Sequence, residues 1–213
     1  MALLIYIIGP DGVGKTTQAR YIEATLSSKG LPAKYVWTRW NHKLSLPILL
    51  LARFLKLTKT RRLENGRTIG YHYFDKMKPI AILYQYTFLI DTMIAYYTKI
   101  RFEQWKGKIV ICDRSPYDAL IDLMISVQND QLINNDVKNM FCRMAKNAIV
   151  ILLIASPRTL QNRREDVSAD KTIAQKVHLY KELFKIHSFH KVDAEKKIQT
   201  VRKEIQEIIN PFL

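Results

Sequence analysis

Eight residues near the amino terminus constrain the fold most strongly. Residues 9–16 read Gly-Pro-Asp-Gly-Val-Gly-Lys-Thr and match the pattern G-x-x-x-x-G-K followed by Ser or Thr. The aliphatic residues 3–8 before this string are typical of a strand buried on both faces, and the apolar spacing of Ala19, Ile22 and Leu26 after it is helical. Glycines in such a loop let successive main-chain N–H groups point inward, and the following helix adds its positive end. The sequence therefore predicts a strand, an anion-binding loop and a helix in succession.

This loop is a candidate site for a nucleoside triphosphate. Lys15 is placed to reach the β- and γ-phosphates, and the Thr16 hydroxyl is a suitable Mg²⁺ ligand. The alternative is a glycine turn that binds nothing. We expect ATP and Mg²⁺ as cofactors. The expected ATP-binding residues are Gly9, Asp11, Gly12, Val13, Gly14, Lys15, Thr16 and Thr17.

Aliphatic runs alternate with helical segments along the rest of the chain. Strands that are aliphatic throughout are typical of a parallel sheet covered on both faces, so we predict a doubly wound α/β fold with a five-stranded parallel sheet in a single domain, residues 1–213. Residues 58–70 and 165–171 are expected to be loops. The other expected strands are 33–38, 108–112, 148–154 and 190–193, and the expected helices are 17–29, 44–57, 80–102, 116–127, 134–145, 157–164, 172–187 and 195–209.

The composition excludes several classes of protein. With 48% hydrophobic and 25% charged residues, the chain is neither disordered nor collagen-like nor a coiled coil. Cys112 and Cys142 are too few for a disulfide scaffold or a four-cysteine zinc site, so we expect free thiols and a cytoplasmic location. The longest apolar runs fall short of the roughly 20 residues that span a bilayer, so no membrane partner is expected.

The charge is strongly positive and unevenly distributed. Thirty-four Lys and Arg against nineteen Asp and Glu give a net charge of +15, and residues 39–78 hold ten of the basic residues and only two acidic ones. This segment is interpreted as an insertion, about residues 40–79, whose basic side chains form either a solvated face or a surface for polyanions. A helical stripe within it is interpreted as core or subunit packing rather than membrane contact. The stripe consists of Leu49, Leu50, Arg53, Phe54 and Leu57.

A charged pair follows the aliphatic run 109–112. Asp113 and Arg114 should emerge at the carboxyl end of a strand, the same edge of the sheet as the glycine loop. Arg114 is suited to clamp a phosphate, and Asp113 to hold Mg²⁺ or to accept a proton from an attacking hydroxyl. The alternative is a structural ion pair that closes the strand.

Several segments together resemble thymidylate kinases. The resemblance lies in residues 9–18, in Thr38-Arg39, in Asp113-Arg114 and in Val192-Asp193-Ala194, in the order in which that family has its motifs. It implies a sheet of the P-loop kinase type, a homodimer, and an arginine-bearing lid over the ATP phosphates. Because the loop position that can hold an arginine in that family is Gly12, the lid, about residues 163–171, would have to supply it.

The resemblance also suggests roles for particular side chains. Arg163 and Arg164 would neutralise charge on the transferring phosphoryl group, although ordinary surface arginines are the alternative. With Lys15, Asp113 and Arg114 they form the expected catalytic set, and Thr16 and Asp113 the expected metal ligands. Phe88 would stack on a base or be simply part of the core. The expected acceptor-binding residues are Asp11, Arg39, Phe88, Asp91, Arg114 and Asp118.

The acceptor itself remains open between two classes. Thr92, Asp118, Asp122 and Leu123 depart from the thymidylate kinase pattern, and the stretch 113–118 also resembles the acceptor motif of deoxynucleoside kinases. A monophosphate is already ionised near neutral pH, whereas a sugar hydroxyl would need Asp113 as general base. We favour a thymidylate kinase-like reaction, dTMP with ATP to dTDP and ADP. The alternatives are a nucleoside or other small-molecule kinase, and a P-loop ATPase whose basic face binds nucleic acid.

Overall fold

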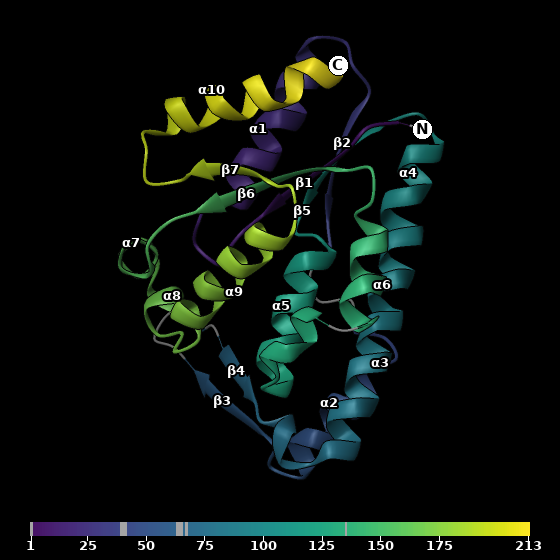
Figure 1. The fold of residues 1–213 in the computed structure, drawn as a ribbon, viewed down its shortest axis with the longest axis vertical. Helices are drawn as coiled ribbons and strands as arrows, with labels where there is room; N and C mark the ends of the chain where they lie inside the picture. The colour runs from purple at the N-terminus through teal and green to yellow at the C-terminus, as the bar shows by residue number, and fades with distance from the viewer. Residues whose placement is uncertain (1, 39–41, 63–65, 67, 135) are drawn as a thin grey trace.

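A five-stranded parallel sheet forms the centre of the molecule (Figure 1). The computed structural model describes residues 2–38, 42–62, 66, 68–134 and 136–213. The strands lie in the order β2-β5-β1-β6-β7, and every neighbouring pair is parallel. The predicted five-stranded parallel α/β sheet is confirmed. The strands are β1 (Leu4–Ile8), β2 (Ala33–Trp37), β5 (Ile109–Asp113), β6 (Ile149–Ile154) and β7 (His190–Asp193).

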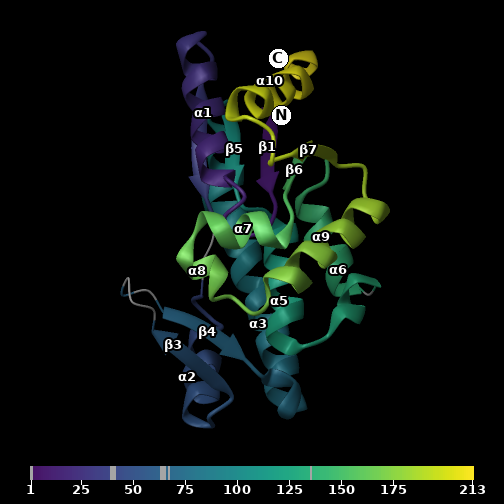
Figure 2. The ribbon, with the colours of Figure 1, turned by 90° about the vertical axis from the view of Figure 1, so that its left-hand side faces the viewer.

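Helices cover both faces of this sheet (Figures 1 and 2). On one face α1 (Lys15–Ser28) and α10 (Ile198–Ile209) pack against Ile5 and Ile7 of β1. On the other face α3 (Lys78–Ala95), α5 (Pro116–Val127) and α6 (Asp136–Met144) pack in a second cluster with Tyr6 and Ile8. Successive strand residues therefore face opposite helical layers, which explains why the three central strands β1, β5 and β6 are apolar at nearly every position.

The remaining helices are shorter or lie at the edges of these layers. α9 (Ile173–Ile186) contributes side chains to both clusters. α3 continues through a π-helical turn (Tyr96–Arg101) into α4 (Phe102–Trp105), so the long helix expected at 80–102 is a single rod of three parts. In the part of the chain that the structure describes, no helix is both long and apolar enough to cross a membrane. The other helical elements are α2 (Leu46–Phe54), α7 (Pro157–Arg163), α8 (Glu165–Ser168) and the 3-10 turns Phe74–Lys76, Asp130–Asn134 and Asn210–Phe212.

Two segments that were expected to be loops are regular structure. Residues 58–70 hold most of an antiparallel hairpin, in which β3 (Thr58–Arg62) pairs with β4 (Thr68–His72). Thr58 Oγ1 and His72 Nδ1 lie 3.0 Å apart across it. The prediction was wrong because β3 is exposed over most of its length and carries no alternation of apolar and polar residues. Residues 165–168 likewise form α8, a single turn with two acidic residues at its start.

The hairpin, α2 and the start of α3 together form the end of the molecule opposite α10 (Figures 1 and 2). Leu57 N donates to Ala52 O and Tyr73 N donates to Leu57 O, so α2 and both ends of the hairpin are joined through main-chain hydrogen bonds. The described residues of the basic segment, expected at about 40–79, thus fold together around α2 and the hairpin.

Candidate functional site

The glycine loop joins β1 to α1 and is shaped by its main chain. Gly9 has φ 142°, and a Cβ there would lie 2.2 Å from the Leu153 carbonyl oxygen, so only glycine fits. Gly14, the N-cap residue directly before α1, adopts φ 102°, and as a glycine it offers no side-chain cap to that helix end. The first main-chain N–H groups of α1 therefore remain available for an anion, as the sequence predicts.

Lys15 lies folded back across this loop. Its Nζ donates to the carbonyl oxygens of Gly9, at 2.5 Å, and Pro10, at 2.9 Å, and the side chain is buried. Burial, and next the nearby Arg114 guanidinium, lower the pKa of Lys15 from its usual 10.5 to about 8, although Asp11 acts in the opposite direction. A phosphate that replaced the two carbonyls would raise this pKa, because its negative charge favours the ammonium form.

Thr16 and Asp113 meet where β1 and β5 lie side by side. Thr16 Oγ1 donates to Asp113 Oδ2 at 2.5 Å, and Tyr35 OH donates to the same oxygen at 3.0 Å. Asp113 is buried, whereas Thr16 is exposed. A hydroxyl beside a carboxylate fits Mg²⁺, which binds oxygen ligands and is held in P-loop NTPases by a loop Ser or Thr and a strand-end Asp.

Arg114 and Lys176 both bind Asp11, from opposite sides. Arg114, at φ 80°, donates through Nη2 to Asp11 Oδ1, and Lys176 Nζ donates to Asp11 Oδ2 at 3.0 Å and to Asp170 Oδ2 at 2.9 Å. Burial by itself lowers the pKa of Lys176, but Asp11, Asp122 and Asp170 outweigh it and raise that pKa above its usual value. Both cations are therefore charged at neutral pH, and Asp11 holds them together.

Asp118 fixes the glycine loop to the start of α5. Its Oδ1 accepts from Tyr180 OH at 2.6 Å and from Gly9 N at 3.4 Å, while Oδ2 accepts from Ser115 N at 2.7 Å in a capping box. Burial raises the pKa of Asp118, but Lys15 and Arg114 oppose this shift. The carboxylate borders the cavity described next, yet its contacts position the loop rather than leave both oxygens for an acceptor.

A cavity of about 770 Å³ opens beside Asp11 and Arg114. Its walls come from α3, α5, the α8–α9 segment and the β4 strand of the hairpin. Phe88 lines it together with Tyr84 and His42, and the Phe88 ring centroid lies 5.5 Å from each of the other two. The cavity thus has a charged end at the glycine loop and an aromatic wall on α3.

The lid region lies directly against the glycine loop. A Cβ added to Gly12 would approach Val167 Cγ2 of α8 to 3.2 Å. Arg164 lines the cavity and donates to both oxygens of Asp166, at 2.9 and 2.5 Å. Arg163 instead donates to the Ala194 carbonyl oxygen at 2.7 Å, so of the two expected lid arginines only Arg164 borders the cavity.

Asp91, one of the expected acceptor residues, does not line the cavity. Asp91 accepts hydrogen bonds from the main-chain N–H groups of Lys43, Leu44 and Ser45, at 2.8 to 3.0 Å, and thereby holds the start of α2. Its placement gives no support to the acceptor-lining role expected for it. Arg39 lies outside the described residues.

Several site residues carried little signal in the sequence. Tyr35 lies in the expected strand 33–38 and Asp170 in the expected loop 165–171, and neither belongs to a recognisable motif. Lys176 offered one clue: it interrupts an apolar stripe of α9 that includes Ile173, Val177 and Tyr180, and a lysine inside such a stripe needs a buried partner.

The arrangement can hold a triphosphate and a metal ion on one side of Asp11 and a second, anionic group on the other. Main-chain N–H groups, Lys15, Thr16 and Asp113 supply the first half, and Arg114 and Lys176 the second.

The sequence of this chain matches no protein-family model and no curated protein.

Proposed function

We propose that this chain is an ATP- and Mg²⁺-dependent phosphotransferase of the P-loop kinase type whose acceptor is a nucleoside monophosphate. One observation carries the proposal: the glycine loop contacts two consecutive residues at the end of β5, through Thr16 with Asp113 and Asp11 with Arg114, and Asp11 and Arg114 also line the large cavity. A donor and an acceptor that occupied these places would meet beside Asp11. The relation to thymidylate kinases stays a resemblance of short motifs.

The donor half would bind the ATP phosphates. The open N-terminus of α1 would bind the β-phosphate, and Lys15 would leave the Gly9 and Pro10 carbonyls to bind the β- and γ-phosphates. Thr16 and Asp113 would hold Mg²⁺, which neutralises phosphate charge as it develops. Arg164, which lines the cavity, would be the lid cation beside the reacting groups.

The acceptor half would bind the phosphate and ring of a nucleotide. Arg114 and Lys176 would bind the acceptor phosphate, and the Phe88 and Tyr84 rings would face a flat base. An acceptor phosphate oxygen then attacks the γ-phosphorus of ATP, the bond to the β–γ bridging oxygen breaks, and ADP leaves. The cavity volume lies within the roughly 300–1,000 Å³ that small-molecule sites occupy.

The contacts of Asp113 favour a phosphate over a hydroxyl acceptor. Its Oδ2 accepts from both Thr16 and Tyr35, and the residue is not part of the cavity wall. A general base must reach the proton that it removes, whereas an ionised phosphate needs no base. Thr92, which lines the cavity where the thymidylate kinase pattern has a base-reading arginine, leaves the identity of the base open.

A screen of acceptors tests this function. ADP release from Mg²⁺-ATP is measured with each nucleoside monophosphate, each nucleoside, and single-stranded DNA or RNA, and products are identified by mass. We expect turnover with at least one monophosphate and none with Lys15→Met. Turnover only with nucleosides would move the assignment to a nucleoside kinase, and stimulation only by nucleic acid would overturn the kinase reading.

A further inference from the structure

The helix α2 lies at the surface, yet Arg53 is its only polar residue. Ile48, Leu49 and Ala52 pack toward the core. The opposite side is solvent-exposed and is here called the α2 face; its most exposed member, Phe54, is 83% accessible. A helix that is apolar all round is normally covered, so the α2 face requires an explanation. The α2 face consists of Leu46, Leu50, Leu51, Phe54 and Leu55.

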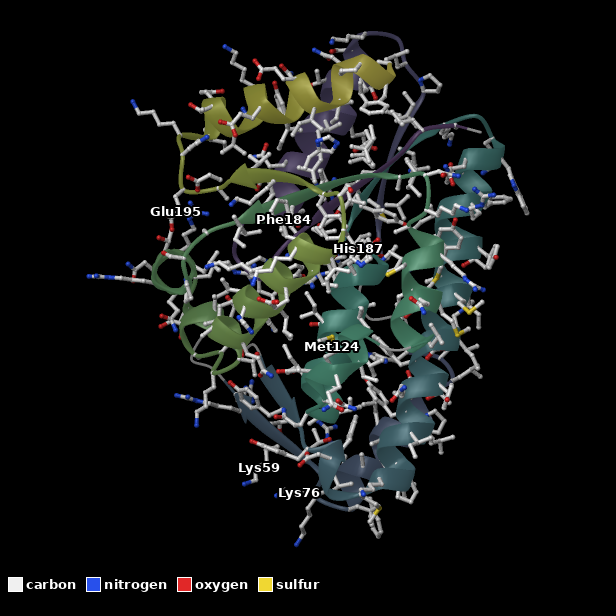
Figure 3. The ribbon with its side chains drawn as sticks, viewed as in Figure 1. Lys59, Lys76, Met124, Phe184, His187 and Glu195 are labelled. Atoms are coloured by element: carbon white, nitrogen blue, oxygen red, sulfur yellow. The ribbon has the colours of Figure 1, made fainter. Side chains whose placement is uncertain are left out.

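Exposed cations surround the α2 face. They lie before, on and after α2, in the hairpin, and just before and at the start of α3. Figure 3 shows two of them, Lys59 and Lys76, at the end of the molecule that holds α2. Among the described residues 42–62 and 68–78 the only acidic residue is Asp75, and none of these cations has a carboxylate partner within 4.0 Å in the described part of the chain. The cations are Lys43, Arg53, Lys56, Lys59, Arg61, Arg62, Lys76 and Lys78.

We propose that the α2 face inserts into the interfacial region of a membrane that contains anionic lipid, with the surrounding cations on the lipid headgroups. Leucine and phenylalanine on one side of a surface helix, flanked by Lys and Arg, are the combination that binds such an interface. The sequence interpretation of this stripe as core or subunit packing holds for Leu49 and Leu57, but Leu50, Arg53 and Phe54 are exposed.

Charge argues against the other possible occupants. A second copy bound through the α2 face would place the same surface against itself, as two-fold symmetry requires, and so would bring these cations together with Asp75 alone as a described counter-charge. Nucleic acid would match the cations but would leave Leu50 and Phe54 without apolar partners. Anionic lipid offers an apolar environment to the α2 face and negative headgroups to the surrounding cations.

Vesicle sedimentation tests this proposal without reference to any enzymatic activity. The full chain is mixed with vesicles of phosphatidylcholine alone, or of phosphatidylcholine and phosphatidylserine in equal parts, at low and at high salt. We expect binding to the anionic vesicles that weakens with salt. We expect Phe54→Ser, at an exposed position, to reduce the partition coefficient by about tenfold or more.

Matched variants separate the apolar from the electrostatic contribution to vesicle binding. The double variant Arg61→Glu with Arg62→Glu should also lose about tenfold or more in binding. Lys29→Glu with Lys34→Glu makes the same change in net charge at exposed sites, and Lys29 lies beside the end of α10, so this variant should lose far less. Trp105→Ser removes an aromatic residue of 72% exposure from α4 and should bind as the unaltered chain does.

Three results would overturn the proposal. The first is no binding to anionic vesicles. The second is binding that Phe54→Ser leaves unchanged, because the α2 face would then not insert. The third is a dimer in solution, measured by light scattering, that Phe54→Ser converts to a monomer, because the α2 face would then belong to a second copy.

Discussion

Thr16 of the glycine loop and Asp113 at the end of β5 are joined by a 2.5 Å hydrogen bond, although 97 positions separate them in the chain. The contact exists because β1 and β5 are neighbours in the sheet and both end at the same edge. The proposed function places its metal ion at this contact, between the loop and the strand.

Replacing Asp113 with Asn should remove the metal-binding charge while keeping an acceptor for Thr16. We expect Mg²⁺-dependent turnover to fall by about a hundredfold or more, since the ion stabilises transferring charge, and the free energy of unfolding to change by about 1 kcal/mol or less. Tyr35→Phe, which removes only the second hydrogen bond to Asp113, is the matched control and should keep most of the activity. Equal losses of turnover in Asp113→Asn and Tyr35→Phe would contradict the proposed role of Asp113 as a metal ligand.

Lys176→Met should affect both stability and acceptor binding. The change leaves Asp170 without the cation that is buried with it and removes one of the cations that bind Asp11, and we expect the free energy of unfolding to fall by about 3 kcal/mol in urea titrations. If the proposed function is correct, the KM for the acceptor also rises more than kcat falls. Lys181→Met, at an exposed position of the same helix, should change neither quantity. An unchanged unfolding curve for Lys176→Met would contradict the ion-pair geometry.

Gly9→Ala should lower the free energy of unfolding far more than an alanine substitution at another glycine with positive φ. The new Cβ would meet the Leu153 carbonyl oxygen at 2.2 Å, and main chain cannot yield without moving β6. We expect a loss of about 3 kcal/mol or more, against about 1 kcal/mol for Gly30→Ala, where φ is 75° and no atom lies within 4 Å. Thermal unfolding of the two variants provides the comparison, and similar losses would show that the loop is packed less closely than described.

The lowered pKa of Lys15 predicts how stability changes with pH. The folded chain loses this proton near pH 8, whereas the unfolded chain keeps it until about 10.5, so between these values the unfolded state binds more protons. Stability contributed by this group therefore rises with pH over that window, by about 3 kcal/mol at most.

The difference between the unaltered chain and Lys15→Met isolates this effect. Urea unfolding across pH 7.5 to about 10.5 should show the unaltered chain gaining stability relative to the variant, because Met cannot titrate. If the free energy of unfolding changed equally with pH in the unaltered chain and in Lys15→Met, this would contradict the burial of a charged Lys15.

The buried strands were predictable because one physical constraint governs them. Residues 109–112 and 149–154 are aliphatic at every position, since each strand faces a helical layer on both sides. The glycine loop was predictable for a similar reason: Gly9 and Gly14 adopt conformations that few other residues tolerate.

The hairpin and the ion pairs were not predictable by the same reasoning. Thr58 to Arg62 form a strand whose exposed side chains show no period, and its pairing with β4 is set by tertiary contacts rather than local pattern. Lys176 reaches Asp11 across 165 positions of sequence, and only the packing of α9 beside the loop brings the two together.

Calorimetric titration of the purified chain with Mg²⁺-ATP is the measurement that shows whether the glycine loop binds a nucleotide. We predict that the unaltered chain binds Mg²⁺-ATP and that Lys15→Met binds it about tenfold or more weakly, because the phosphates lose a buried ammonium partner. No heat of binding to the unaltered chain, or equal affinity in the variant, would contradict a nucleotide site at the glycine loop.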